Sequence, residues 1–167
     1  MLLFLFFMME PSLAKAILGS GYKEEKIHTH SIVPLGNATV EATFVFPPYD
    51  RSLRDLDHVG VSQMHEALVE GLYCAVGYAL ERGEITLPFD LQTFIQTKMQ
   101  ASLFMREQLS FRKLIKPGEE ARLTLTVTAI QEKMHGKYIS VTVSIQGFMR
   151  GEAECWLRKT EEDVPLA

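Results

Sequence analysis

The feature that most constrains this chain is a long, nearly uninterrupted apolar segment at residues 59–80. Within residues 64–80 (MHEALVEGLYCAVGYAL) only His65, Glu66 and Glu70 break the apolar run. A helix that is hydrophobic almost all round belongs in the interior of a protein, so this segment predicts a central helix. Carboxylates on such a helix need a partner, a proton or a chemical role, because an unpaired buried charge is very costly.

The segments that follow predict strands. Polar and apolar residues alternate there with a period of two, and Leu123, Leu125, Val127 and Ala129 are expected on one face. The same alternation recurs in two further segments, residues 139–145 and 153–157. Pro-Gly and His-Gly pairs supply turns between them, so we expect about four antiparallel strands after the central helix.

Shorter elements flank the central helix. Residues 11–18 begin with proline and end at Gly-Ser-Gly, which predicts a short helix. Residues 27–33 and 38–46, joined by a turn at 34–37, predict a hairpin, and residues 90–100 predict another short helix. The predicted fold class is α+β, with one antiparallel sheet wrapped around a long central helix.

Length and composition favour a single domain over residues 1–167, with an apolar extension at 1–10 and the short helix at 11–19. The net charge of −4, with no long basic stretch, argues against a nucleic-acid partner. The opening MLLFLFFMM is too short to span a bilayer, which takes about 20 residues. Cys74 and Cys155 are expected to be buried, reduced thiols, and the predicted location is the cytoplasm.

The start of the central helix is a candidate site for acyl transfer. His58 and Gly60 precede the helix, and Ser62 and Gln63 lie in its first turn, where they are expected to contact substrate. Backbone N–H groups at a helix start lack intrahelical acceptors and carry the positive end of the helix dipole. The N–H of Gly60 or its neighbour is therefore expected to polarise a carbonyl group and to stabilise the oxyanion that develops on it.

Glu66 is the predicted general base, because partial desolvation on a buried helix would raise the pKa of its carboxyl group. Glu70, one turn further on, is the competing candidate, and one of the two glutamates is expected to have a structural role. His28 and His30 have a spacing compatible with a metal ion, but no third ligand lies nearby. They are therefore expected to be exposed strand residues, and no metal is predicted.

A small cluster of positively charged side chains lies within residues 112–116. Arg112, Lys113 and Lys116 lie beside the turn at residues 117–118, and we expect them to contact the phosphates of a nucleotide-bearing thiol carrier. A solvated strand end is the alternative interpretation. The sequence contains no glycine-rich phosphate loop and no G-x-S-x-G elbow, so it does not support a dinucleotide enzyme, an NTPase or a serine hydrolase.

Residues 109–122 (LSFRKLIKPGEEAR) resemble the stretch in which hotdog-fold dehydratases and thioesterases enter their second long strand. Residues 148–157 (FMRGEAECWL) resemble the final strand of those proteins. Within that superfamily the chain is most similar to the FcoT-like long-chain fatty-acyl-CoA thioesterases. The similarity is carried by short identities in the same order and spacing, at Leu13-Ala14, Tyr22, His58, Tyr73, Phe111-Arg112-Lys113, Ala121-Arg122-Leu123 and Gly151-Glu152.

The resemblance implies hydrolysis of a medium- to long-chain acyl thioester of coenzyme A or of an acyl-carrier protein, without a cofactor. In that group two tyrosines and an asparagine act on the substrate; Tyr22 and Tyr49 match the tyrosines. The asparagine is replaced by Gly60, so Glu66 is expected to supply the missing function. The fold implies a homodimer with sheets placed edge to edge, or a higher assembly of such dimers, and the apolar side of the helix (Leu68, Leu72, Val76) is expected to line an acyl tunnel.

Two alternative functions fit the same resemblance. One is a non-catalytic acyl-CoA-binding protein with a regulatory role, which the missing asparagine favours. The other is a 3-hydroxyacyl thioester dehydratase that uses His58 and Glu66. Dehydratases of this superfamily have a proline-rich loop after the histidine, whereas residues 59–65 contain no proline, and this difference disfavours the dehydratase.

Overall fold

The computed structural model describes residues 11–22, 26–48 and 58–159. The predicted extension at residues 1–10 and the predicted site residue Tyr49 lie outside these ranges. The helices are α1 (Pro11–Gly19), α2 (Val61–Glu81) and α3 (Leu91–Ala101). The strands are β1 (Thr29–Gly36), β2 (Thr39–Val45), β3 (Ser102–Phe111), β4 (Glu120–Lys133), β5 (Tyr138–Gly147) and β6 (Met149–Arg158).

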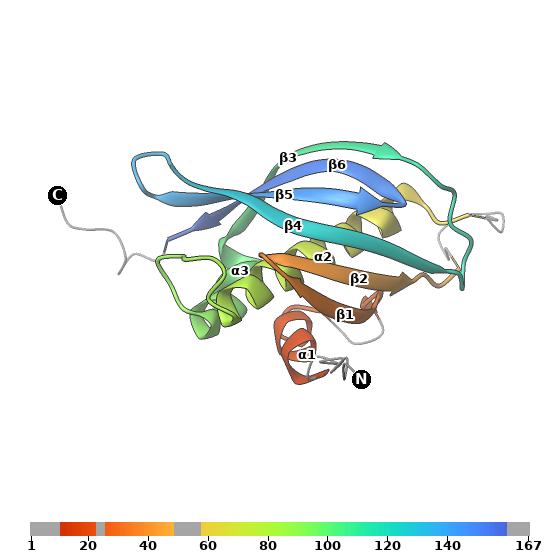
Figure 1. Ribbon diagram of the computed structural model, residues 1–167, viewed down its shortest axis with the longest axis horizontal. Helices are drawn as coiled ribbons and strands as arrows, with labels where there is room; N and C mark the ends of the chain where they lie inside the picture. Colours follow the sequence, from red (N-terminus) through yellow and green to blue (C-terminus); the bar gives the residue numbers. More distant parts are fainter. Residues whose placement is uncertain (1–10, 23–25, 49–57, 160–167) are drawn as a thin grey trace, which may run out of the picture.

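The six strands form one antiparallel sheet in the order β1-β2-β4-β5-β6-β3, with β1 and β3 at its edges. The sheet curls over α2, while α1 and α3 lie on the other side of that helix (Figure 1). The predicted α+β class, with an antiparallel sheet wrapped around a long central helix, is confirmed. Gly151 lets two strands approach closely, because a Cβ there would lie 1.9 Å from the carbonyl oxygen of Gln108.

The structure corrects the predicted hairpin turn. Strand β1 continues through Pro34 as far as Gly36, and the turn lies at Asn37 and Ala38, which both have a φ of 52°. A two-residue turn with positive φ at both positions matches the twist of a hairpin. Proline is tolerated within β1 because this strand is at the edge of the sheet and one side needs no N–H donor.

The structure also corrects the predicted register of β4. Leu123 and Leu125 are buried as expected, but the pairing of β4 with β5 shifts between Val127 and Ala129. The bulge leaves one extra residue on β4, and everything beyond it moves to the opposite face. Ala129 therefore lies opposite Thr142 rather than sharing the inward face of Leu123.

Helix α2 is enclosed on all sides only in its C-terminal half. Gly71 faces the sheet, where a Cβ would lie 3.2 Å from a methyl group of Leu125. Gly77 faces the other two helices, and a Cβ there would lie 2.5 Å from a methyl group of Ile17 and 3.4 Å from the ring of Phe94. Small residues on opposite sides thus let the sheet and two helices close on α2, as a helix that is apolar all round requires.

The core contains several residues whose roles were predicted. Both cysteines are buried and free of disulfides, as expected. Leu68, Leu72 and Val76 are also buried in this core. The prediction that these three line an acyl tunnel stays a prediction, although they are almost inaccessible to solvent. None of the helices in the described part of the chain has both the length and the apolar character needed to cross a membrane.

Candidate active site

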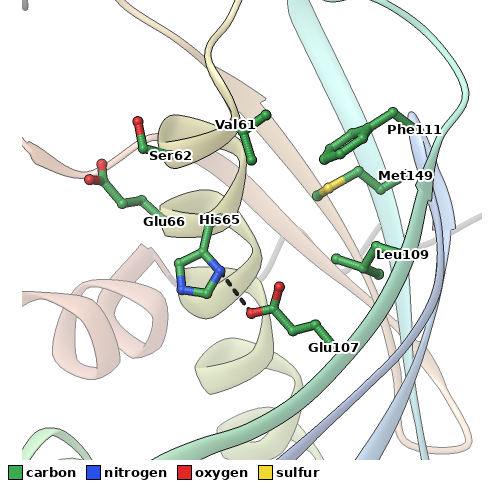
Figure 2. Close-up of a pocket in the computed structure, with 8 residues that line it drawn as sticks. All are labelled: Val61, Ser62, His65, Glu66, Glu107, Leu109, Phe111 and Met149. Atoms are coloured by element: carbon green, nitrogen blue, oxygen red, sulfur yellow. Dashed lines mark ion pairs between the residues drawn. The ribbon is translucent and has the colours of Figure 1, made fainter.

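The N-terminal half of α2 leaves one stripe of side chains exposed beside a cavity. Val61, Ser62, His65 and Glu66 are all exposed, at the spacing of one helix face. A cavity of about 410 Å³ lies between this stripe and the edge strand β3. Its remaining lining consists of Glu107, Leu109, Phe111 and Met149. Most of the cavity surface is apolar, and its ionisable side chains are His65 and Glu66 on the helix and Glu107 on β3 (Figure 2).

An ion pair joins the two walls of this cavity. His65 Nδ1 lies 2.8 Å from Glu107 Oε1, so α2 and β3 are connected by side chains at this point. Val61 and His65 point towards β3, whereas Ser62 and Glu66 point to the other side of the helix (Figure 2). All four helix residues line the cavity, but the Ser62 and Glu66 side chains extend from the side of the helix that faces away from β3 (Figure 2).

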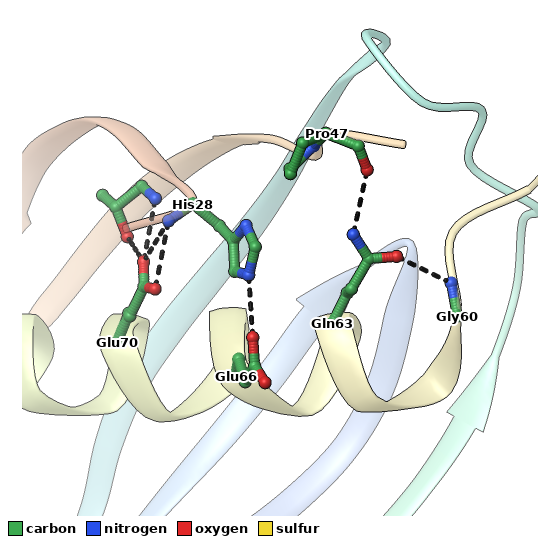
Figure 3. A network of polar contacts seen from close by, with 7 residues as sticks. His28, Pro47, Gly60, Gln63, Glu66 and Glu70 are labelled. Carbon is green, nitrogen blue, oxygen red and sulfur yellow. Dashed lines mark hydrogen bonds and ion pairs between the residues drawn. The ribbon is translucent and has the colours of Figure 1, made fainter. Parts of the chain in front are cut away.

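Glu66 is held by a histidine that sequence reasoning missed. His28 Nε2 lies 3.0 Å from Glu66 Oε2 (Figure 3). The His28 side chain is only 8% exposed and its ring packs against Phe46, with 5.3 Å between the ring centroids. The prediction that His28 is an exposed strand residue is therefore wrong, although His30 is exposed as expected. The predicted burial of Glu66 is also wrong, because its side chain is 57% exposed.

Glu70 is the buried glutamate, and its role is structural. Its carboxylate is inaccessible to solvent and accepts hydrogen bonds from the backbone N–H groups of His28 (3.0 Å) and Thr29 (2.8 Å). The Thr29 hydroxyl donates a further bond of 2.6 Å. Burial raises the pKa of the Glu70 carboxyl, while these donors oppose that rise. Glu70 thus fixes the start of β1 on α2 and brings His28 to Glu66 (Figure 3).

The start of α2 is held by a buried amide. Gln63 Oε1 accepts a hydrogen bond of 3.2 Å from the Gly60 N–H, and Gln63 Nε2 donates one of 2.9 Å to the Pro47 carbonyl. Gln63 was predicted to contact substrate, but both ends of its buried amide are used within the protein. The Gly60 N–H, predicted to polarise a carbonyl, is used as well. The N–H groups of Val61 and Ser62 come next, and at these positions a helix supplies no acceptor of its own.

Tyr22 lies near the two glutamates. It packs at the edge of the core, and burial, followed by the charges of Tyr73, Glu70 and Glu66, raises the pKa of its hydroxyl. Its hydroxyl is therefore protonated at neutral pH and can donate a hydrogen bond. His58 is half-buried two residues before the N-cap, and the histidine that contacts Glu66 is His28 rather than His58.

The three residues of the predicted positive cluster differ in their contacts. Arg112, Lys113 and Lys116 are all exposed. Lys113 is paired with the carboxylate of Glu119, and the backbone N–H of Lys116 also donates to that carboxylate. The chain here runs beside the start of α2, because the Val59 N–H donates a 2.7 Å hydrogen bond to the Ile115 carbonyl.

No group of three or more metal-ligating side chains occurs in the described residues. One signal in the sequence could have identified His28. Two glutamates one turn apart on an otherwise apolar helix need partners, and the histidine and threonine at 28–29 begin the strand that supplies them. The His65–Glu107 pair has no comparable signal, because it joins residues that only the tertiary fold brings together.

Comparison with known proteins gives a fold but no family. No protein-family model matches the sequence, and no curated protein does. Among solved structures, an HP0420 homologue from Helicobacter felis is 13% identical, with 92% of this chain and 95% of that chain covered and a TM-score of 0.53. The dehydratase heterocomplex ApeI:P from Xenorhabdus doucetiae is 9% identical, with 90% and 93% covered and a TM-score of 0.51. The chain thus has the hotdog fold, as the resemblance in its sequence implied.

Proposed function

We propose that this protein hydrolyses acyl thioesters, with Glu66 as the general base. The observation that carries the proposal is an exposed carboxylate, held by a buried histidine, beside a mostly apolar cavity. The volume of about 410 Å³ is within the range of ligand pockets. An acyl chain is the substrate part that this lining favours, since Leu109, Phe111 and Met149 have no charge to offer a polar group.

Glu66 and His28 have different roles in the proposed reaction. His28 binds one oxygen of Glu66 and orients the carboxylate, so the other oxygen can accept a proton from water. The water oxygen then bonds to the thioester carbonyl carbon, the C–S bond breaks, and the thiolate receives the proton. The products are a carboxylic acid and a free thiol. The first-turn N–H groups and the Ser62 hydroxyl, one turn before Glu66, are the donors available to the oxyanion.

The exposure of Glu66 and the burial of His28 favour hydrolysis over dehydration. A dehydratase needs a base that reaches the substrate carbon, whereas the His28 ring is buried and its Nε2 is bound to Glu66. Glu66 is the group that substrate can reach. Dehydration of a 3-hydroxyacyl thioester is the second candidate, since a histidine and a carboxylate do lie in contact. Hydration of crotonyl-CoA without thiol release would favour it.

The proposal also includes three properties that the resemblance implies: a preference for long acyl chains, a dimeric state and a location in the cell. It includes an FcoT-like preference for long-chain acyl-CoA, because Tyr22, which matches one of the two tyrosines of that group, lies near Glu66. It includes a homodimer, because β3, which lines the cavity, is an edge strand of the sheet that a second copy can extend, and a cytoplasmic location. Sedimentation of the purified protein tests the dimer.

The decisive experiment measures thiol release from acyl-CoAs of increasing chain length. Glu66→Gln should lower kcat by about 100-fold or more, the usual contribution of a general base. Glu81→Gln is the matched control, because Glu81 is an exposed glutamate at the far end of the same helix. Full turnover by Glu66→Gln would refute the assigned base. Saturable acyl-CoA binding without turnover by the wild type would indicate a non-catalytic binding protein.

A further inference from the structure

Two arginines lie together on the outer face of the sheet, where β3 ends. In the β3–β6 pairing Ser110 lies opposite Arg150, and the N–H of Arg112 donates a 2.9 Å hydrogen bond to the Phe148 carbonyl. Side chains alternate between the two faces of a strand, so Ser110, Arg112 and Arg150 share a face. That face is opposite to the one on which Phe111 lines the apolar cavity.

A second cavity lies between these arginines. Its volume is about 420 Å³, and its lining comprises Gln108, Leu109, Ser110, Arg112, Arg150, Gly151 and Glu152. Both arginines are exposed, and within the described residues neither guanidinium group forms an ion pair or hydrogen bond. Glu152 is the one acidic residue of the lining, so the cavity carries a net positive charge.

Two unpaired guanidinium groups that line one cavity suit a phosphate. Arginine presents several N–H donors in a planar arrangement that binds phosphate oxygens in pairs, and it does so more specifically than lysine. Lys113, the neighbour of Arg112, is already paired with Glu119. The cation available beside Arg112 is therefore Arg150, which the sequence places 38 positions away and the sheet brings close.

The two cavities meet at the end of β3. Phe111 lines the apolar cavity on the inner face, and Arg112, the next residue, lines the charged cavity on the outer face. Leu109 contributes to both linings. A ligand with an apolar acyl end, a long uncharged arm and a phosphorylated end matches this order of surfaces.

We infer that Arg112 and Arg150 bind the phosphates of a nucleotide-bearing thiol carrier of the coenzyme A type, whose uncharged arm passes the end of β3. The inference rests on the proposed thioester hydrolysis and assigns the two residues, on the sheet face opposite the apolar cavity, that would hold the phosphorylated end of the carrier. Glu152 weakens the site by repulsion of the phosphates. Its removal should therefore strengthen carrier binding, whereas removal of either arginine should weaken it.

The test compares two substrates with the same acyl group, a coenzyme A thioester and an N-acetylcysteamine thioester, which has no phosphate. Arg112→Gln and Arg150→Gln should each raise the KM for the coenzyme A thioester by about three- to tenfold and leave the KM for the short thioester unchanged. Glu152→Gln should lower the KM for the coenzyme A thioester alone. Arg158→Gln is the matched control, since Arg158 is an exposed arginine at the other end of β6.

Binding of adenosine 3′,5′-bisphosphate, measured by calorimetry, gives a readout that needs no turnover. The wild type should bind it, and the Arg112→Gln/Arg150→Gln double variant should not. Binding that persists in the double variant, or that the wild type lacks, overturns the inference, as does an equal KM change for both thioesters. Turnover of the short thioester tests the proposed hydrolysis separately, so the two ideas can fail independently.

Discussion

Replacement of Glu70 by alanine tests the division of roles between the two helical glutamates. The Glu70 carboxylate is inaccessible to solvent and accepts the backbone N–H groups of His28 and Thr29. Glu70→Ala removes the acceptor for both groups, and a buried N–H without a partner costs about 1–3 kcal/mol. The two N–H groups together therefore account for about 2–6 kcal/mol.

Two effects place the expected loss in the lower part of that range. The Thr29 N–H is only partly buried, so water can replace part of its lost bond. Removal of a buried carboxylate also relieves the desolvation that raises its pKa. We expect Glu70→Ala to lower the free energy of unfolding by about 2–4 kcal/mol, which is a fall of roughly 4–16 °C in Tm for a domain of this size.

Thermal unfolding followed by circular dichroism measures this loss, and Glu81→Ala is the matched control. Glu81 is an exposed glutamate at the far end of the same helix, so its replacement should change stability by no more than about 0.5 kcal/mol. Glu70→Gln keeps one acceptor oxygen and should fall between the two. A Tm for Glu70→Ala within about 2 °C of the Glu81→Ala value would refute the structural role assigned to Glu70.

Three further predictions concern pH, backbone and thiols. Because burial raises the folded pKa of Glu70 above its ordinary value of 4.5, the wild type should lose stability relative to Glu70→Gln as the pH rises from that value through the folded pKa; urea titrations at several pH values would show parallel curves if this is wrong. Gly151→Ala should cost about 2–5 kcal/mol, because its φ is 154° and its Cβ would overlap a carbonyl oxygen of β3, whereas Gly19→Ala, with open space around it, should be nearly neutral in the same melts. Burial raises the pKa of Cys74 and brings that of Cys155 to about 12, so iodoacetamide should label neither thiol before unfolding, and mass spectrometry of native protein would reveal any labelling.

The architecture could be predicted from the sequence because its signals are periodic. An apolar segment too long for a surface helix predicted α2, and the alternation around Leu123 and Val143 predicted the strands that cover it. The bulge in β4 could not be predicted, because Thr128 continues the alternating pattern without a break. Its position depends on how β4 twists against β5, which is a property of the assembled sheet.

The site was harder to predict than the fold, because its residues meet only in the tertiary structure. Glu66 and Glu70 lie on the same stripe of α2. The difference in their burial depends on where β1 begins. His28 contacts a residue 38 positions away, and Gln63 reaches a carbonyl 16 positions away. Composition and spacing singled out the helix turn that carries these polar groups, but the partner of each group follows from the folded chain.

The double attachment of His28 has a consequence for how the site is prepared. Its backbone N–H is bound by Glu70 and its ring by Glu66, one helical turn earlier. The orientation of the imidazole is therefore fixed when β1 docks on α2, before any ligand arrives. The entropy lost in ordering this ring belongs to folding rather than to association, so little of the free energy of binding is diverted to organising the carboxylate.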